Sequence, residues 1–366
     1  MEQWQAALTD HDLIARLTDH LRQLDLPPVR LMEVCGTHTM AIARYALRDL
    51  MPEAITLTSG PGCPVCVTAT GDIDSFIAAS RIPNTIITTF GDLIRVPGSD
   101  SSLQKEMGCG NDIRVVYSPL DALELARTNP DREVIFLGVG FETTTPTVAA
   151  AILTARKEKI ANFSIISSHK IMMPALEALV ADPQIRIDGL LCPGHVSVVI
   201  GADAYTSLVD QHHTPCVVTG FEPLDILQGI TLLAHQIAEQ TPKVEVAYQR
   251  AVNQAGNQRA RAVIEEVFEP TGASWRGLGE IEQSGLILRD DFKQFDARKR
   301  FNLATLPSRE PQGCRCGEVL KGIMQPPDCK LFNRGCTPGH PIGPCMVSSE
   351  GACAAFHKYD TALCKD

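Results

Sequence analysis

The sequence predicts an α/β protein in which two parallel-sheet units are followed by a cysteine-rich C-terminal segment. Two observations carry this prediction: short apolar runs alternate with helical segments over residues 29–242, and seven of the thirteen cysteines lie in the last fifty-odd residues. Continuous apolar runs with helices between them are typical of parallel strands covered on both faces. A tail rich in Cys, Pro and Gly cannot bury much core alone, so we expect a metal or cluster to order it.

A helix is expected near the start of the chain. Leu13, Leu17 and Leu21 recur at helical spacing and predict an amphipathic helix over residues 11–24. We assign residues 1–28 to this N-terminal helical segment.

Eight short apolar runs then predict strands. They cover residues 29–34, 54–58, 85–89, 113–117, 133–138, 163–167, 189–191 and 216–219. The first four fall within residues 29–131 and the last four within 132–242, so we expect two successive α/β domains. The ligand site of an open parallel sheet lies beyond the carboxyl ends of its strands. Because the Gly-, Cys- and His-rich motifs all follow such ends, we expect a site in a cleft between the two units.

The pattern changes from residue 243 onward, and we assign residues 243–366 to a helical and cysteine-rich domain. Residues 246–268 predict one long helix, polar on one face and apolar on the other. Residues 273–301 are interrupted by glycines, including Gly277, and predict a mixed, extended connection.

Composition and charge exclude several classes of protein. The 366 residues are 44% hydrophobic and 21% charged, with a formal net charge of -10. This charge gives no electrostatic reason to expect nucleic acid as a partner. The N-terminus lacks a basic region followed by an apolar core, and the apolar stretches fall short of the ~20 residues of a membrane span. We expect a cytoplasmic protein without a membrane partner, whose clustered cysteines bind metal or act in catalysis.

The tail cysteines predict an iron–sulfur cluster with two additional thiols. Six of them exceed by two the four thiolates that a [4Fe–4S] cluster needs. They are Cys314, Cys316, Cys329, Cys336, Cys345 and Cys353. Flanking Pro and Gly residues suit tight turns that aim sulfurs at one centre. Zinc and plain reduced thiols are the alternatives, although no paired C-x₂₋₄-C ligands of a structural zinc site occur in the tail.

The motif CGTHTM places Cys35 and His38 three residues apart, directly after a predicted strand. If a helix starts there, its amide groups lower the pKa of the Cys35 thiol and make it a better nucleophile or metal ligand. The alternative is a buried cysteine at a strand end, with a histidine that only caps the helix.

The motif GPGCPVC holds Cys63 and Cys66 as a CxxC pair at a Gly-rich turn after a strand. This arrangement is typical of a redox dithiol whose leading thiol is activated by a helix start. Zinc would need a second pair of ligands, and no such pair is obvious nearby.

Weaker candidates follow the later strands. Glu142 in GFETTTP and His195 in CPGHVS are suited to positioning a polar ligand or exchanging protons, and His169 in SSHK is equally ambiguous. Each is also compatible with an ordinary loop residue. Cys109, Cys216 and Cys364 have no partner motif. The nucleotide-binding patterns GxGxxG and GxxxxGK[ST] do not occur.

Taken together, CGTHTM, SGPGCPVC, GFETT, CPGHVS and GCRCGEVLKG…CTP…GPCMVSSEGAC resemble the HypD family of [NiFe]-hydrogenase maturation factors, from about residue 30 to the C-terminus. The resemblance implies two Rossmann-like domains around a cleft plus a [4Fe–4S] domain. It also implies a scaffold that pairs with the small chaperone HypC while an iron acquires cyanide and carbon monoxide. Cyanide would arrive from HypE, after HypF-dependent carbamoylation, and the Fe(CN)₂CO unit would pass to the hydrogenase large-subunit precursor.

The resemblance also implies roles for individual residues. Cys35 becomes a ligand of the iron in the Fe(CN)₂CO unit, shared with a cysteine of HypC, and His38 stands beside it. Cys63 and Cys66 become the redox-active dithiol. The family spacing C-x₁₄-C-x₆-C-x₁₆-C falls on the cluster ligands Cys314, Cys329, Cys336 and Cys353, leaving Cys316 and Cys345 as a thiol pair. Spacing leaves open a second quartet of Cys329, Cys336, Cys345 and Cys353.

Two other functions compete with a redox-active assembly scaffold, which would not itself be a turnover enzyme. One is a stand-alone iron–sulfur thiol–disulfide oxidoreductase, similar in logic to ferredoxin:thioredoxin reductase, which needs only the CxxC pair and the cluster. The other is a zinc-stabilised binding protein. Cys35 discriminates between the first two, because only the scaffold requires a third, iron-binding thiol.

Overall fold

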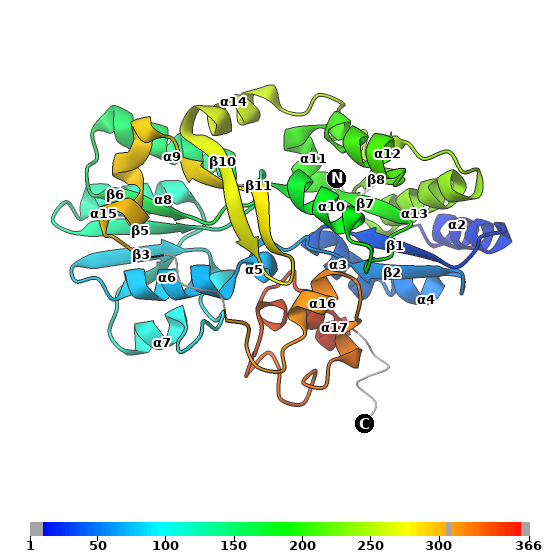
Figure 1. Cartoon of the computed structure of the whole chain (residues 1–366), viewed down its shortest axis with the longest axis horizontal. Coiled ribbons are helices and arrows are strands. Elements are labelled where there is room, and N and C mark those ends of the chain that lie inside the picture. Colours follow the sequence, from blue (N-terminus) through cyan, green and yellow to red (C-terminus); the bar gives the residue numbers. More distant parts are fainter. Residues whose placement is uncertain (1–9, 305–308, 360–366) are drawn as a thin grey trace.

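Two parallel β-sheets lie side by side and carry most of the fold (Figure 1). The computed structural model describes residues 10–304 and 309–359. The first sheet has the strand order β2-β1-β7-β8-β9 and the second has the order β4-β3-β5-β6. The strands are β1 Val29–Glu33, β2 Ile55–Ser59, β3 Thr85–Thr89, β4 Ile113–Val115, β5 Glu133–Gly138, β6 Phe163–Ser167, β7 Gly189–Pro193, β8 Cys216–Thr219 and β9 Val244–Val246.

All eight expected strands are confirmed, but their grouping differs from the expected successive units. β1 pairs with β2 and with β7, so that Leu31 lies opposite Gly189. The chain therefore leaves the first sheet after β2, builds the second sheet, and returns at β7. Each sheet thus combines strands from residues 29–131 with strands from residues 132–242. Apolar runs identify strands, whereas long-range pairing decides their neighbours.

Helices cover both faces of the sheets (Figure 1). They are α2 His11–Gln23, α3 Gly36–Arg44, α4 Leu47–Leu50, α5 Pro64–Val67, α6 Thr70–Ser80, α7 Leu103–Gly108, α8 Pro119–Thr128, α9 Thr145–Glu158, α10 Met172–Ala181, α11 Gly194–Ile200, α12 Thr206–His212, α13 Pro223–Ala238, α14 Gln258–Val267, α15 Ala297–Arg300, α16 Cys316–Leu320 and α17 Ala352–Tyr359. The expected opening helix is α2, which begins after the N-cap Asp10 and packs against α13. Among the described residues no helix is long and apolar enough to cross a membrane.

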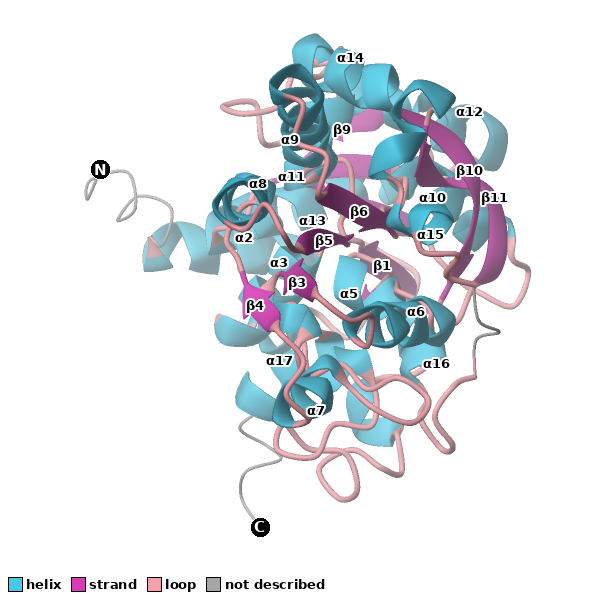
Figure 2. Ribbon diagram, turned by 90° about the vertical axis from the view of Figure 1, so that its left-hand side faces the viewer, coloured by secondary structure: helices cyan, strands magenta, loops and turns pink. Residues whose placement is uncertain are grey.

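The two sheets share one hydrophobic core and each has a second core of its own. The shared core joins Met32 and Leu190 of the first sheet to Ile135 of the second. On its other face the second sheet packs Phe136 against Ile152 of α9. Figure 2 shows this sheet between α8 and α9 on one face and α6 on the other. The sheets are therefore held together by buried apolar surface, which fixes their strand ends relative to one another.

An antiparallel hairpin replaces the expected extended connection. β10 (Phe268–Trp275) pairs with β11 (Gly279–Leu288), and the hairpin runs between the two sheets in Figure 1. The expected long helix over 246–268 is also wrong in its first half, because helix α14 begins only after the N-cap Asn257. Gly256 precedes it at a φ of +69° against the backbone of Gly201, a contact that periodicity does not reveal.

The C-terminal region consists of short helices and turns packed below the first sheet in Figure 1. Its 3₁₀ turn η5 (Pro344–Met346) contacts α5, and α17 packs against α3. Its own hydrophobic core is small, with four buried residues at its centre. These are Phe332, Cys336, Met346 and Phe356.

Candidate functional site

The CGTH and GPGC loops follow adjacent strands β1 and β2 and contact each other through their backbones. The amide of Gly36 donates a hydrogen bond to the carbonyl of Gly62 over 3.0 Å. A Cβ on Gly62 would lie 2.1 Å from the amide nitrogen of Cys35, so only glycine fits there. The parallel pairing of β1 with β2 therefore brings the thiol at Cys35 next to the loop that carries Cys63.

Cys35 is the N-cap residue of α3 and is buried, with 6% of its surface exposed. The expected helix start is present, and the amides of His38 and Thr37 do lower the pKa of the thiol. Burial and the nearby carboxylate of Glu350 outweigh them and raise the pKa of Cys35 to about 12. The expectation of an acidic thiol is therefore wrong, because these helix amides lower the pKa of Cys35 by less than burial raises it.

Glu33, which was not among the predicted site residues, is the last residue of β1 and contacts Cys35. Its carboxyl group accepts hydrogen bonds from the Cys35 amide (3.1 Å) and from the Thr39 hydroxyl. Burial raises the pKa of Glu33 to about 7. The available signal was an acidic residue at the end of an otherwise apolar strand, since a buried carboxyl group needs partners.

His38 points into the protein and is fully buried. Its Nε2 lies 2.9 Å from the carbonyl oxygen of Gly220. A carbonyl can only accept, so Nε2 carries the proton and Nδ1 of the neutral ring is an unprotonated acceptor. Nδ1 has no hydrogen-bond partner among the described residues, and burial lowers the pKa of His38 to about 4.

His195 joins this site through an aromatic ring. The ring of Phe221 stacks on His195 with centroids 4.0 Å apart and lies 5.0 Å from the ring of His38. Unlike His38, His195 is exposed. The first sheet thus gathers Cys35 and His38 from the end of β1 and His195 from the end of β7, as expected for a site at the carboxyl edge.

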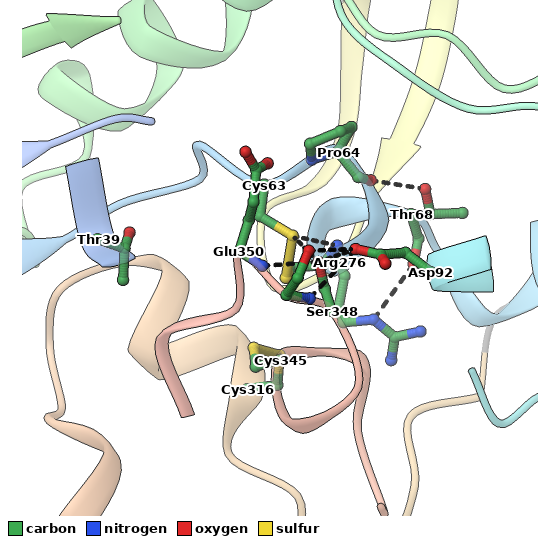
Figure 3. Close-up of a disulfide and its surroundings, with 12 residues drawn as sticks. Thr39, Cys63, Pro64, Thr68, Asp92, Arg276, Cys316, Cys345, Ser348 and Glu350 are labelled. Carbon is green, nitrogen blue, oxygen red and sulfur yellow. Dashed lines mark hydrogen bonds between the residues drawn. A yellow bond between two sulfur atoms is a disulfide. The ribbon is translucent and has the colours of Figure 1, made fainter. Parts of the chain in front are cut away.

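Cys63 and Cys66 form a disulfide at the start of α5 (Figure 3). Both are buried, and the amide of Cys66 donates to Cys63 Sγ over 3.1 Å. Cys63 Sγ also lies 3.4 Å from the hydroxyl of Ser348 in the tail, which in turn donates to Asp92 over 3.0 Å. A single tail serine therefore connects the disulfide to the second sheet.

Glu350, two residues beyond Ser348, covers the start of α3. Its carboxylate accepts a hydrogen bond from the Thr37 hydroxyl over 2.8 Å. Its Cβ would lie 2.4 Å from a Cβ placed on Gly36. The short tail segment 345–350 therefore contacts both the Cys63 loop and the Cys35 loop. Thr37 and Glu350 are 313 residues apart in the sequence, so sequence spacing could not reveal their contact.

The tip of the hairpin lies between the disulfide-bearing elements. The amide of Arg276 donates to Val67 and its Nε donates to the carbonyl of Thr68, so its buried guanidinium holds the end of α5 (Figure 3). Gly277, at a φ of +80°, lies so close to Gly317 of α16 that a Cβ would be 2.4 Å from the Gly317 Cα. Gly317 follows Cys316, so one turn contacts both α5 and α16.

All six predicted tail cysteines line one apolar cavity. A disulfide joins Cys316 to Cys345. The other four are free thiols: Cys314, Cys329, Cys336 and Cys353. The four free thiols are the members of the first predicted quartet, whereas Cys345 of the second quartet is in the disulfide.

Backbone groups lie close to two of these four sulfur atoms. Cys336 Sγ accepts a hydrogen bond from the Ile342 amide over 3.3 Å. Gly343 lets the backbone approach Cys314, because a Cβ there would lie 2.6 Å from the sulfur. Burial and the neighbouring cysteines raise the pKa of Cys353.

Glu142 and His169 lie apart from the cysteine loops. The carboxyl group of Glu142 accepts from the amide of Met172, and burial raises its pKa to about 7. His169 is buried beside Ser167. Cys109 is exposed, Cys216 is buried, and Cys364 lies outside the described residues.

Comparison with known proteins agrees with the motifs. The family model described as "HypD: Hydrogenase formation hypA family" matches residues 11–360. The chain is 46% identical to hydrogenase maturation factor HypD of Rhodobacter capsulatus, over 95% of this chain and 94% of the relative. It is 47% identical to the Escherichia coli protein of the same name, over 93% of this chain and 91% of the relative. A putative hydrogenase expression/formation protein of Methanocaldococcus jannaschii is 39% identical to it, over 96% of this chain and 98% of the relative.

The family match spans both sheets, the hairpin and the tail, and the relatives are covered over nearly their whole length. The chain therefore belongs to the HypD family of hydrogenase maturation factors.

Proposed function

We propose that this protein is the scaffold on which, together with a small HypC-type chaperone, the Fe(CN)₂CO unit of [NiFe]-hydrogenases is assembled. The iron is the substrate, and cyanide comes from a HypE-type donor. The completed unit then passes to the hydrogenase large-subunit precursor. One observation carries this proposal: the tail segment 345–350 contacts the loops of both Cys35 and Cys63, which joins three thiol systems in one site.

Cys35 supplies one thiolate to the iron, and the chaperone supplies another. The thiol is protonated while buried without a cation, and a bound ferrous ion favours its thiolate, with the proton released to solvent. The unprotonated Nδ1 of His38, three residues further along the chain, is a buried acceptor without a hydrogen-bond partner among the described residues. Because the second ligand belongs to another protein, the iron is able to leave when the two proteins separate.

A [4Fe–4S] cluster fits the four free tail thiols better than zinc does. Zinc requires its ligands to converge on one ion at about 2.0–2.3 Å. Within residues 10–304 and 309–359 no three His, Cys, Asp or Glu side chains converge in that way. In a cluster each thiolate binds a different iron, so the sulfurs need only line a common cavity, as these do. When bound, such a cluster supplies single electrons at low potential.

The two disulfides relay reducing equivalents toward Cys35. Reduction of Cys316–Cys345 consumes two electrons and two protons and yields two thiols. One of these thiols, as its thiolate, attacks the Cys63–Cys66 bond, and a mixed disulfide then resolves to re-form Cys316–Cys345 and release the reduced Cys63–Cys66 dithiol. The hairpin tip supports this exchange because it contacts the elements that carry both disulfides.

Replacement of Cys35 by alanine tests the proposal. We expect Cys35→Ala to abolish hydrogenase maturation in cells while the tail retains its iron, sulfide and visible absorbance. Cys109→Ala, which changes an exposed free cysteine, is the matched control and should mature hydrogenase normally.

The same variant separates the scaffold from a stand-alone oxidoreductase. An oxidoreductase needs only the Cys63–Cys66 pair and the cluster, so its activity would survive Cys35→Ala. Maturation at the wild-type level in Cys35→Ala would therefore sink the scaffold function.

A further inference from the structure

A positively charged groove lies beside β6, the edge strand of the second sheet. Its volume is about 770 Å³, and it is bounded by the end of α9, the loop at 160–161, the 3₁₀ turn η3 (Asp290–Phe295) and α15. Figure 1 shows α9 and α15 at one end of the molecule, away from α16 and α17 of the tail. None of the described residues that line the groove is a cysteine, so it is separate from the thiol site.

The groove carries positive charge that its surroundings do not balance. Its described lining contains five cationic side chains and no carboxylate. These are Arg156, Lys159, Lys293, Lys299 and Arg300. Arg156 pairs with Glu266 over 3.4 Å, and Arg300 pairs with Glu133. The three lysines are exposed, and none of them forms a salt bridge within the described part of the chain. Three positive charges are therefore uncompensated, in a protein whose formal net charge is -10.

The groove also presents apolar surface between these charges. Phe295 and Ile160 belong to its lining, and Phe295 is otherwise buried. The hydrocarbon stems of the lysines extend such a surface while their ammonium groups stay in water. A ligand with both acidic and apolar groups is therefore better suited to this groove than a purely ionic one.

The positions of the charges disfavour a compact anion such as phosphate. The lysines lie on three elements: Lys159 ends α9, Lys293 is in η3 and Lys299 is in α15. The C-terminal end of a helix carries partial negative charge, which repels an anion placed directly against α9. Both arginines, the residues that bind phosphate with two parallel hydrogen bonds, already have carboxylate partners.

Acidic residues flank the groove and disfavour a long polyanion. Asp290 and Asp291 begin η3, and Glu158 precedes Lys159 at the end of α9. All three are exposed. A nucleic acid carries a negative charge at every phosphate, so a strand that leaves the groove meets like charge. A short protein segment can instead confine its acidic residues to the groove.

We propose that this groove is a docking surface for a short segment of a partner protein in which Asp or Glu residues alternate with apolar residues. The carboxylates pair with Lys159, Lys293 and Lys299, and the apolar side chains pack on Phe295 and Ile160. The proposal is independent of the thiol site and of the function proposed for that site.

Fluorescence anisotropy on the full-length protein tests the proposal with a short labelled peptide in which Glu alternates with Leu. A peptide with Gln in place of each Glu is the matched control ligand. We expect saturable binding of the acidic peptide that weakens with added salt, because exposed charges are screened. The Gln peptide should bind roughly tenfold more weakly or not at all, since it retains only the apolar contacts.

Lys159→Asn removes one charge without strain. Lys159 has a φ of +58°, in the left-handed region that asparagine tolerates well at the end of a helix. Binding should weaken about two- to fivefold in Lys159→Asn and in Lys299→Gln, as for loss of one exposed ion pair. Both changes combined with Lys293→Gln should weaken binding roughly tenfold or more, if the three pairs contribute independently.

Lys157→Gln is the matched control variant, because Lys157 is an exposed lysine of α9 that does not line the groove. It should bind the acidic peptide like the wild type. Binding that is not saturable, or that Lys157→Gln weakens as much as Lys299→Gln does, would overturn the proposal. Tighter binding of ATP or of a single-stranded oligonucleotide, with the same dependence on the three lysines, would overturn the assignment to a protein segment.

Discussion

The sheet-edge thiols and the tail thiols differ in what holds them in place. Cys35 and Cys63 follow paired parallel strands and are fixed by β1 and β2 and by a core that both sheets share. The tail thiols lie on short helices and turns. The separate core of the tail has four buried members among the described residues, while Cys316 and Cys345 belong to the core that both sheets share. Secondary structure therefore positions the first group, whereas the second group depends more on cross-links between sulfur atoms.

This difference predicts that loss of sulfur ligation affects the two regions unequally. The sheets bury enough apolar surface to fold without any thiol chemistry. The tail resembles small domains in which disulfides or metals replace a sufficient core. Four measurements test this contrast, beginning with the largest expected effect.

Cys336→Ser should release the tail while leaving the sheets folded. Cys336 belongs both to the small tail core and to the free-thiol group that lines the tail cavity. We expect hydrogen-exchange protection over residues 309–359 to fall toward that of an open chain, while amides in β5 stay protected. Cys109→Ser should show neither change, and unaltered tail protection in Cys336→Ser would contradict the account.

Removal of the two disulfides should have different effects on stability. Cys316 and Cys345 are 29 residues apart, whereas Cys63 and Cys66 are 3 apart. Chain entropy predicts losses of about 3.5 and about 1.5 kcal/mol for the paired Cys→Ser variants. Urea unfolding or hydrogen exchange of each double variant would measure this, and equal losses would show that the tail does not depend on its longer cross-link.

The second sheet should lose stability as pH rises because of Glu142. Its pKa is raised from 4.5 to about 7, so its contribution is complete below pH 4.5 and is lost as pH rises through 7. The upper limit is on the order of 3 kcal/mol. Glu142→Gln should flatten the stability profile between pH 5 and 8, measured by urea unfolding.

Glu106 provides a control of opposite sign. Its ion pair with Arg81 lowers the pKa of Glu106 to about 2, so its contribution is lost only as pH falls from 4.5 through 2. Glu106→Gln should therefore leave the profile above pH 5 unchanged in slope. A profile for Glu142→Gln that is as steep as the wild type would rule out this source of pH dependence.

Gly277→Ala should disturb the contact between the hairpin tip and the tail. Gly277 and Gly279 both have a φ near +80°, but only Gly277 lies against Gly317, whereas Gly279 faces open space. Both substitutions strain the backbone by about 1–2 kcal/mol. Gly277→Ala should cost more and should also slow reduction of Cys63–Cys66, which thiol trapping would detect. Identical behaviour of both variants would show that this contact has no role in the exchange.

The strands could be predicted because each is a continuous apolar run, and so could the positions of Cys35 and Cys63 at their ends. The pairing of β1 with β7 could not, because nothing in an apolar run identifies its neighbour. The hairpin was missed because its strands are partly exposed and interrupted by glycines.

The candidate site was predictable in its cysteines and not in its supporting residues. Ser348, Glu350 and Arg276 reach Cys63, Thr37 and α5 across long sequence separations, so only the folded chain reveals them. The lowered pKa expected for Cys35 failed for a related reason. Local helix geometry was visible in the sequence, whereas the burial of Cys35 and a carboxylate from the tail were not.

Infrared spectroscopy of the protein co-purified with its small chaperone tests the central claim most directly. The account predicts absorption bands of iron-bound cyanide and carbon monoxide in the wild-type complex. It predicts their loss in Cys35→Ala, with the visible absorbance of the tail cluster unchanged. Bands that persist in Cys35→Ala, or a maturation-competent wild-type complex that lacks them, would contradict the assignment of Cys35 as the ligand of the iron.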